Sequence, residues 1–304
     1  MSTFHKFSVV TTILLFLFGC GGGGGGDEGV TYTGKTTPAV ITDTNAKTLA
    51  EGVIGGSSTG TAFGVVSDEQ EVQPAPTILN VARIFSGAVT QLDISPASAT
   101  LPGAIQTVKE TETCQDSGSI SINLKVDDIT LDFNGTFNFI NCAEGGTTIN
   151  GKTTVSGSLS TGVLNLAFDP KVTVSSGSES YTMSGTVNVS GDTIVMNVRV
   201  RNSNTQMVEW LNNVTITATD NFSFVEMTIT GRYYHPQHGY IDIVTIDALR
   251  INDFDQFPSS GQIIITGASG SKARLTATSN TQYTLEVDPD GDDIYEPPTT
   301  ENWG

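Results

Sequence analysis

From Ser117 almost to the C-terminus, apolar and polar residues alternate along the chain with a period of two. Ile120, Ile122 and Leu124, for example, are separated by single polar residues. Because successive side chains of a β-strand point to opposite faces of a sheet, this pattern predicts strands with one buried and one wet face. Short turn signals separate the runs, which favours antiparallel neighbours in a meander. We therefore expect a mainly β fold of about 11–12 strands within residues 117–296.

A large sheet with one apolar face cannot lie open in water. It must pack as a sandwich, curl into a barrel, or wrap around a helix. Apolar residues at helical spacing predict a helix over residues 76–92, and a shorter helix is expected over residues 45–51, ending at Gly52 or at Gly55-Gly56. We therefore expect a curved sheet or partial barrel, packed by one or two N-terminal helices, with a sandwich as the alternative.

The N-terminus resembles a bacterial lipoprotein junction. An apolar run leads to Gly19-Cys20, and six glycines follow. This pattern predicts a signal peptide over residues 1–19, acyl chains on Cys20 that attach the protein to a membrane, and a flexible tether over residues 20–37. Gly21 after the cysteine, by resemblance to sorted lipoproteins, points to the outer membrane, at its periplasmic face or at the cell surface. The alternative is an ordinary signal peptide followed by an unrelated cysteine.

The other two cysteines, Cys114 and Cys142, form an even pair. In an exported protein we expect such a pair to form a disulfide. A loop of about 29 residues closed in this way should stabilise the fold by about 3–4 kcal/mol in the chain-entropy model. Two cysteines without a nearby histidine have poor spacing for a metal site.

Charge restricts the partners of the chain. The net charge is −18, and removal of residues 1–19 takes away one lysine, which leaves about −19. Such a chain repels nucleic acid and anionic headgroups, so we expect no nucleic-acid partner, and the acyl anchor is the expected membrane attachment. For the rest of the chain, we expect a segment of helix and loop over residues 38–116 that packs on the β domain, and a C-terminal tail over residues 297–304.

The acidic stretch near the C-terminus resembles a calcium loop. Asp288, Asp290 and Asp292 alternate around Gly291, and Glu296 could supply a further oxygen to Ca²⁺. The stretch departs from the EF-hand pattern, which has glycine at its sixth position and a glutamate at its twelfth. An acidic, solvated turn is the slightly favoured alternative.

His235 and His238 could both offer ring nitrogens to a transition metal. No third ligand is evident beside them, and Pro236 makes the stretch a loop. We therefore favour a turn between two tyrosine-containing strands.

The mature chain as a whole resembles the uncharacterised lipoproteins of Gram-negative bacteria. The resemblance rests on the glycine run after Cys20, the Thr-x-x-Asn-Ala start at residues 42–46, the cysteine-bounded serine-rich strands, the Asp-x-Asp-Gly-Asp stretch from Asp288, and Trp303. These motifs are short, and the resemblance implies a location but no activity.

Three hypotheses for the function follow. No nucleophile elbow, phosphate loop or HExxH motif is present, so we expect a non-enzymatic structural or binding module, with a protein partner or a hydrophobic ligand. The second hypothesis is a carrier of a lipid or other hydrophobic ligand in a half-barrel cavity. The third and weakest is a hydrolase, since it needs a tuned carboxylate or histidine that the sequence does not single out.

Overall fold

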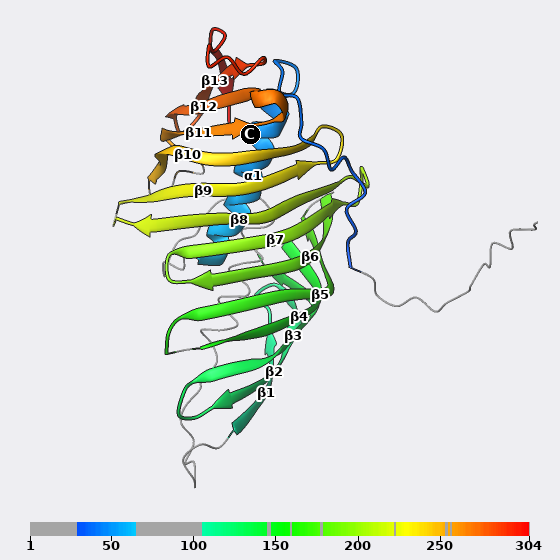
Figure 1. Ribbon diagram of the computed structural model, residues 1–304. Helices are drawn as coiled ribbons and strands as arrows, with labels where there is room; N and C mark the ends of the chain where they lie inside the picture. Colours follow the sequence, from blue (N-terminus) through cyan, green and yellow to red (C-terminus); the bar gives the residue numbers. More distant parts are fainter. Residues whose placement is uncertain are drawn as a thin grey trace, which may run out of the picture.

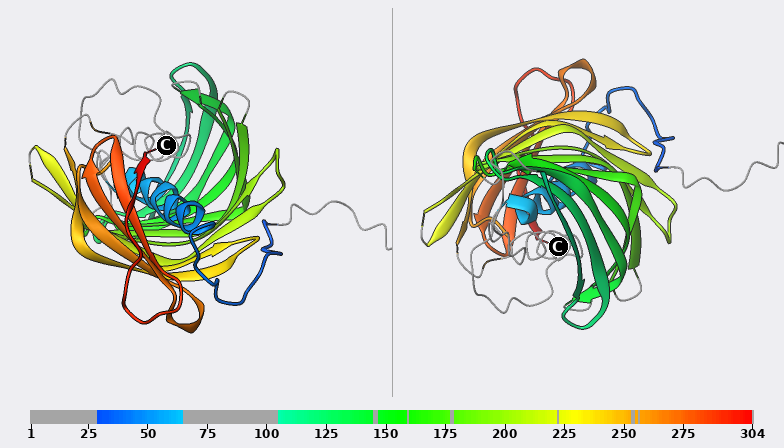
Figure 2. Two further views of the ribbon diagram at one scale, coloured as in Figure 1. Left: turned by 90° about the horizontal axis from the view of Figure 1, so that it is seen from above. Right: turned by 90° about the horizontal axis from the view of Figure 1, so that it is seen from below.

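The computed structural model describes residues 29–64 and 105–303, except for residues 145–146, 159, 177–178, 222, 253–254 and 256. These residues form one antiparallel sheet, one α-helix and a short 3-10 helix. The strands follow one another through the sheet in sequence order, and the sheet curves around the helix (Figures 1 and 2). The expected mainly β fold, a large curved antiparallel meander, is confirmed.

The described part of the sheet has 14 strands. Their bounds are β1 Ile105–Thr113, β2 Ser117–Asp127, β3 Asp132–Glu144, β4 Thr147–Ser158, β5 Val163–Ser176, β6 Glu179–Ser190, β7 Thr193–Asn202, β8 Val208–Asp220, β9 Phe224–His235, β10 Gly239–Asn252, β11 Ser260–Thr266, β12 Lys272–Ser279, β13 Gln282–Asp288 and β14 Thr299–Asn302. The 3-10 helix η1, Ala268–Gly270, lies between β11 and β12. Among these strands, β1 and β14 are the two edges and do not pair with each other.

Two strands lie outside the expected β domain. β2 to β13 fall within residues 117–296, whereas β1 lies in the segment expected to be helix and loop, and β14 in the expected tail. β1 carries Gln106, Glu110 and Glu112 on the side that faces the apolar residues of β2, with Glu110 opposite Ile122. Polar residues therefore lie on both faces of β1, so the strand lacks the apolar alternation that marks the inner strands. β14 has the sequence Thr-Thr-Glu-Asn and no apolar residue to signal a strand.

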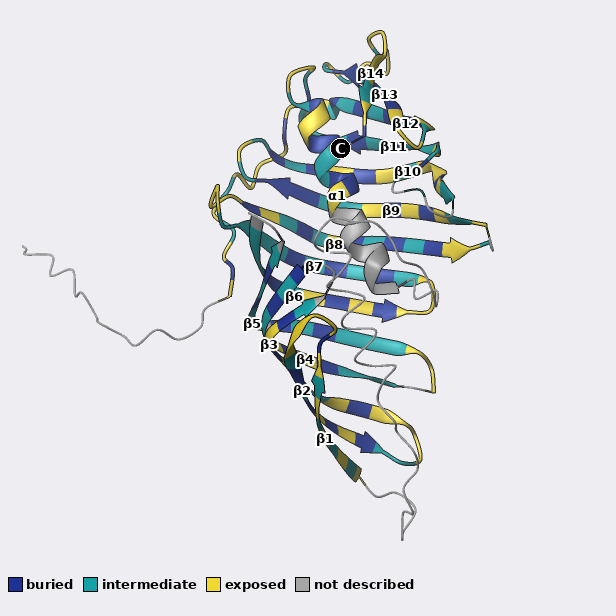
Figure 3. Ribbon diagram, turned by 180° about the vertical axis from the view of Figure 1, so that it is seen from behind, coloured by how far each residue is buried: buried dark blue, intermediate teal, exposed yellow. Residues whose placement is uncertain are grey.

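The concave face of the sheet is apolar and the convex face is polar. Along inner strands such as β2 and β8, buried residues alternate with more exposed ones, as Figure 3 shows by colour. The buried side chains form one continuous core that runs from β2 to β13 and includes the apolar residues of the helix. The sheet therefore hides one face and leaves the other wet, as the period-two pattern predicts.

The helix α1, Ala46–Gly64, lies on the concave side and contacts β7, β8, β9, β12 and β13. It is longer than the expected helix over residues 45–51, because Gly52 does not end it. Gly52 faces Tyr233 of β9, and a Cβ at this position would lie 2.4 Å from the Tyr233 Oη. This glycine therefore allows close packing of helix on sheet. The second expected helix, over residues 76–92, lies outside the described residues.

Residues 29–41, which we call the rim segment, run along the ends of the strands from β6 to the β11–β12 connection before α1 begins. The Val30 N–H donates to the Ser184 Oγ of β6 (2.9 Å), and the Ala39 N–H donates to the Tyr240 carbonyl of β10 (2.8 Å). At the far end the Ile41 N–H donates to the Ser271 Oγ (3.0 Å). The expected tether over residues 20–37 therefore does not extend to Thr37.

The β14 edge is closed by an aromatic side chain. Trp303 is buried, packs on Tyr283 with the ring centroids 4.4 Å apart, and donates from Nε1 to the Ser279 carbonyl (3.0 Å). Glu301 of β14 pairs with Lys47 of α1 (2.6 Å), which fastens the edge strand to the helix. The last residues of the chain are thus part of the packed domain.

Candidate functional site

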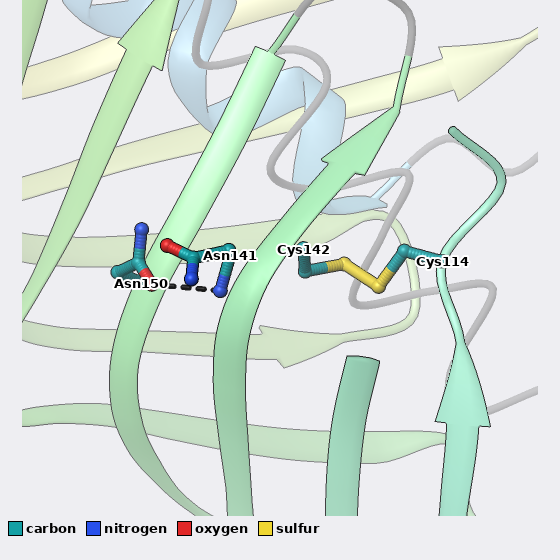
Figure 4. Close-up of a disulfide and its surroundings, with 4 residues drawn as sticks. All are labelled: Cys114, Asn141, Cys142 and Asn150. Atoms are coloured by element: carbon teal, nitrogen blue, oxygen red, sulfur yellow. Dashed lines mark hydrogen bonds between the residues drawn. A yellow bond between two sulfur atoms is a disulfide. The ribbon is translucent and has the colours of Figure 1, made fainter. Parts of the chain in front are cut away.

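The expected disulfide between Cys114 and Cys142 is present, with the two Cα atoms 5.4 Å apart. It joins the end of β1 to β3 across the start of β2 (Figure 4). A β-bulge in β3 positions Cys142 for this disulfide. Asn141 has a positive φ of 47°, its N–H donates to the Asn150 Oδ1 (2.7 Å), and the pairing of β3 with β4 shifts between Phe139 and Cys142. The extra residue turns Cys142 to the buried face of the sheet.

Three of the four expected calcium ligands converge. Asp288, Asp290 and Asp292 each place a carboxylate oxygen within 4.8 Å of the others, but Glu296 does not join this group. The Asp288 carboxylate is buried and already accepts hydrogen bonds from three backbone N–H groups. These belong to Gly291 (2.8 Å), Asp292 (3.2 Å) and Asp293 (3.0 Å). Asp288 therefore acts as the internal cap of an acidic turn.

The two histidines lie at the β9–β10 hairpin turn, as expected. The His235 Nδ1 accepts the N–H of Gln237 (3.2 Å), and the rings of His235 and His238 stack with their centroids 4.6 Å apart. Burial of His235, together with the nearby His238, lowers the pKa of His235 from 6.5 to about 4. The neutral form of His235 is thus the one that the folded state favours near neutral pH.

A row of aromatic and arginine side chains on the convex face fastens the rim segment. Trp210 of β8 stacks on Tyr234 of β9 with the centroids 4.5 Å apart, and Tyr234 contacts Tyr240 of β10 at 5.3 Å. The Arg199 guanidinium lies 4.7 Å from the centre of the Trp210 ring. Tyr32 of the rim segment packs on Tyr234 at 5.6 Å, and burial raises the pKa of Tyr32 to about 12. The sequence pattern does not predict this row, because the row depends on the register of three hairpins.

The convex face of β1 to β7 carries three adjacent cross-strand rows, and these three rows alone are what we call the polar face. Each row contains residues that lie directly opposite one another on neighbouring strands. The first row is Lys109, Asn123, Thr136, Thr154, Ala167, Thr186 and Asn197; the second is Thr107, Lys125, Asn134, Ser156, Asn165, Asn188 and Val195; the third is Thr111, Ser121, Asn138 and Lys152. No Asp or Glu occurs in these three rows, although the chain has 32 acidic residues. The next row beyond Lys125 carries Asp127 and Asp132, so it bounds the polar face with negative charge.

The cations of the polar face are exposed and free of ion pairs. Lys109, Lys125 and Lys152 are all exposed, and none lies within ion-pair distance of a carboxylate in the described part of the chain. On β9 and β12, by contrast, two convex arginines are paired with acids. Arg232 of β9 binds Asp242 of β10 (2.7 Å), and Arg274 of β12 binds Glu286 of β13 (2.7 Å). The polar face is therefore a local region of unbalanced positive charge on an acidic protein.

A shallow hollow of about 290 Å³ opens at the edge of the polar face. It lies between β1 and β2 and is lined by Lys109, Glu110, Thr111, Ser121, Ile122 and Asn123. Its walls carry one cation and one carboxylate, with hydroxyl groups and an amide, so it can donate and accept hydrogen bonds but has no net charge. The sequence signal for this site was weak. Lys125 was visible between Leu124 and Val126, but only the register places it near Lys109.

Cys20, the expected lipidation site, lies outside the described residues. No helix in the described part of the chain is long and apolar enough to cross a membrane. No family model, curated protein or solved structure matches the chain.

Proposed function

We propose that the protein is an exported lipoprotein, held at the outer membrane by acyl chains on Cys20, whose β domain is a non-enzymatic binding module. The observation that carries the proposal is the filling of the concave face. The main contacts of α1 are with other strands, yet side chains on β3, β4 and β5 are also buried. Each of the three side chains Phe137, Val155 and Leu166 exposes 1 % or less of its surface. The domain thus uses its apolar face as a core, which leaves the wet face for partners.

The same observation weighs against the carrier hypothesis. A half-barrel carrier needs an apolar cavity of several hundred Å³. Side chains that border an empty cavity wider than a water molecule would retain accessible surface, because a water-sized probe could touch them. Of the concave side chains of β2 to β6, Ile122, Leu124, Ile149, Val172 and Met183 are also exposed by 1 % or less. A bound lipid would have to displace packed side chains.

Two features support this proposal. The disulfide between Cys114 and Cys142 is stable in oxidising compartments and rare in the cytosol. The packed domain includes Val30, which is bound to Ser184 at the rim, so an acylated Cys20 would be separated from it by only about nine residues. Both features agree with attachment through Cys20.

The anchor is tested by substitution of Cys20 with alanine in a Gram-negative host. The wild-type protein should incorporate radiolabelled palmitate and sediment with outer membranes, whereas the Cys20→Ala protein should incorporate none. Cys114→Ala is the matched control, since it removes a different cysteine and should keep the label. Palmitate incorporation by the Cys20→Ala protein would refute the anchor.

The binding role is tested by mass spectrometry of the protein purified in detergent. We expect acyl chains on the peptide that contains Cys20 and no lipid bound at a constant molar ratio inside the domain. A lipid that remains bound at one molecule per chain after detergent exchange would instead establish the carrier.

A further inference from the structure

We propose that the polar face, the three rows on the convex side of β1 to β7, binds an anionic polysaccharide. This inference rests on the proposed binding function and names its partner class. The polysaccharide would lie across the strands along the rows, with its carboxylate groups near Lys109, Lys125 and Lys152 and its hydroxyl groups on the serine, threonine and asparagine side chains.

The distribution of charge carries the argument. In a chain of net charge −18, the three rows contain three lysines and no acidic residue. Exposed lysines on an acidic protein usually gain from a nearby carboxylate, as Arg232 and Arg274 do on β9 and β12. Those of the polar face have no such partner in the described residues. They are therefore free to pair with anions supplied by another molecule.

The chemistry of the rows also fits a sugar chain. Hydroxyl and amide groups can both donate and accept hydrogen bonds, as sugar hydroxyls do. Lys109 and Lys125 lie in adjacent rows on neighbouring strands, and Lys152 lies in the third row on β4. Neighbouring strands lie about 4.8 Å apart, so a row across seven strands extends for about 29 Å. This length suits an extended polymer with repeated anionic groups better than a single small anion.

Three other partners fit less well. Nucleic acids need aromatic side chains on which bases stack, and the three rows contain none. A protein interface needs an apolar or aromatic centre, and the rows offer only Ala167 and Val195. Anionic headgroups would approach the corner of exposed Ile105 and Ile129, where Asp127 and Asp128 would repel them.

The experiment measures binding of alginate, a polymer of uronic acids, to the full-length protein purified from membranes in detergent. Neutral dextran is the control polymer. The test variant is Lys109→Gln/Lys125→Gln/Lys152→Gln. The matched control is Arg232→Gln/Lys272→Gln/Arg274→Gln, which removes the same charge from paired positions. A further variant, Asn123→Asp, places one negative charge inside the first row with little change of shape. Thermal melts establish that each variant is folded.

We expect alginate to bind, dextran not to bind, and the affinity for alginate to fall as salt is raised, because the contacts are exposed. The lysine variant should lose about tenfold in affinity, Asn123→Asp should weaken binding by a smaller factor, and the control should change by less than about twofold. Absence of alginate binding, equal binding of dextran, or equal losses in the lysine variant and the control would overturn the proposal.

Competition separates the remaining partners. Mixed micelles that contain phosphatidylglycerol, or poly(dT), should not displace alginate. Displacement by either at lower concentration than alginate itself would assign the face to that partner instead. Failure of these binding tests leaves palmitate labelling at Cys20 unaffected, so the anchor and the partner class can fail separately.

Discussion

The two ends of the sheet differ in whether the cations on the convex face form cross-strand ion pairs. In β9 to β13, two arginines pair with acids on the neighbouring strand, Arg232 with Asp242 and Arg274 with Glu286. In β1 to β4, Lys109 and Lys152 stand among hydroxyl and amide groups and have no such pair in the described residues. The fold is the same meander throughout, so the difference does not come from topology. It indicates that one end uses its charges for stability and the other keeps them available.

The largest expected effect lies at the β1 end. Replacement of Cys114 and Cys142 by serine should lower the free energy of unfolding by about 3–4 kcal/mol, because the loop that they close gains freedom in the unfolded chain. Denaturant unfolding measures the loss. Hydrogen exchange should show lower protection in β1 to β3 than in β9 to β13. A uniform loss of protection would mean that the two ends unfold as one unit.

The next effect lies under the opposite end, where α1 packs. Gly52→Ala should destabilise the protein by about 1–3 kcal/mol, since the new Cβ would lie 2.4 Å from the Tyr233 Oη and must displace a buried ring. The gain in helix propensity, about 1 kcal/mol, offsets part of the clash. Gly55→Ala, on the same helix with no atom within 4 Å of the added Cβ, is the control and should stabilise. A stable Gly52→Ala protein would show that the helix can shift away from β9.

The hairpin of β9 and β10 should make this end sensitive to acid. The pKa of His235 is 6.5 in the unfolded chain and about 4 in the folded protein, so the unfolded state binds the proton first. The free energy of unfolding is therefore unaffected by His235 above about pH 6.5. As the pH falls from 6.5 to about 4, protonation of His235 in the unfolded chain lowers the free energy of unfolding by about 1–3 kcal/mol. Melting of the His235→Gln protein over this range should show a smaller slope with pH. An unchanged slope would assign the sensitivity to other groups.

The ion pairs give a smaller and more direct test of the comparison. Arg274→Gln should cost about 0.5–1 kcal/mol, because it removes a half-buried cross-strand pair with Glu286. Lys152→Gln removes the same charge from the polar face and should leave the melting midpoint unchanged. Equal losses in the two variants would show that the lysines of the polar face also stabilise the fold.

The smallest expected effect concerns calcium. The Asp288 carboxylate is already bonded to three backbone N–H groups, and Asp293 pairs with Lys272, so the loop is held without a cation. We expect the melting midpoint to be the same in calcium and in chelator. A rise of the midpoint with calcium that Asp290→Asn abolishes would establish a structural site there.

The sequence predicts the strands well where one face is apolar. Ile120, Ile122 and Leu124 mark β2, and such patterns locate the strands up to β13. β1 and β14 could not be found in this way, because edge strands are only partly covered and carry residues such as Glu110 and Glu301 on the concave side. The glycine pattern predicts a helix end at Gly52 or at Gly55-Gly56, but α1 continues past both. The missing side chain of Gly52 instead allows close contact with Tyr233.

For the candidate sites too, the sequence predicts local features but not those that depend on strand register. The disulfide and the histidine turn depend on residue type and local spacing, and both were predicted. The polar face depends on which residues lie opposite one another across seven strands, which alternation alone does not fix. Lys109 and Asn123 are 14 positions apart in the chain and are direct neighbours in the sheet only through the pairing of β1 with β2.

The rim segment also determines how the domain responds to mechanical load. A pull on the N-terminal end of the chain enters the domain at Val30 and meets the bond to Ser184 first. The next attachments, at Pro236 and Tyr240 and finally at Ser271, lie further along the rim. They would open one after another, as in peeling, before any force reaches α1. The attachments of the rim segment would therefore break before the packing of α1 on the sheet is disturbed.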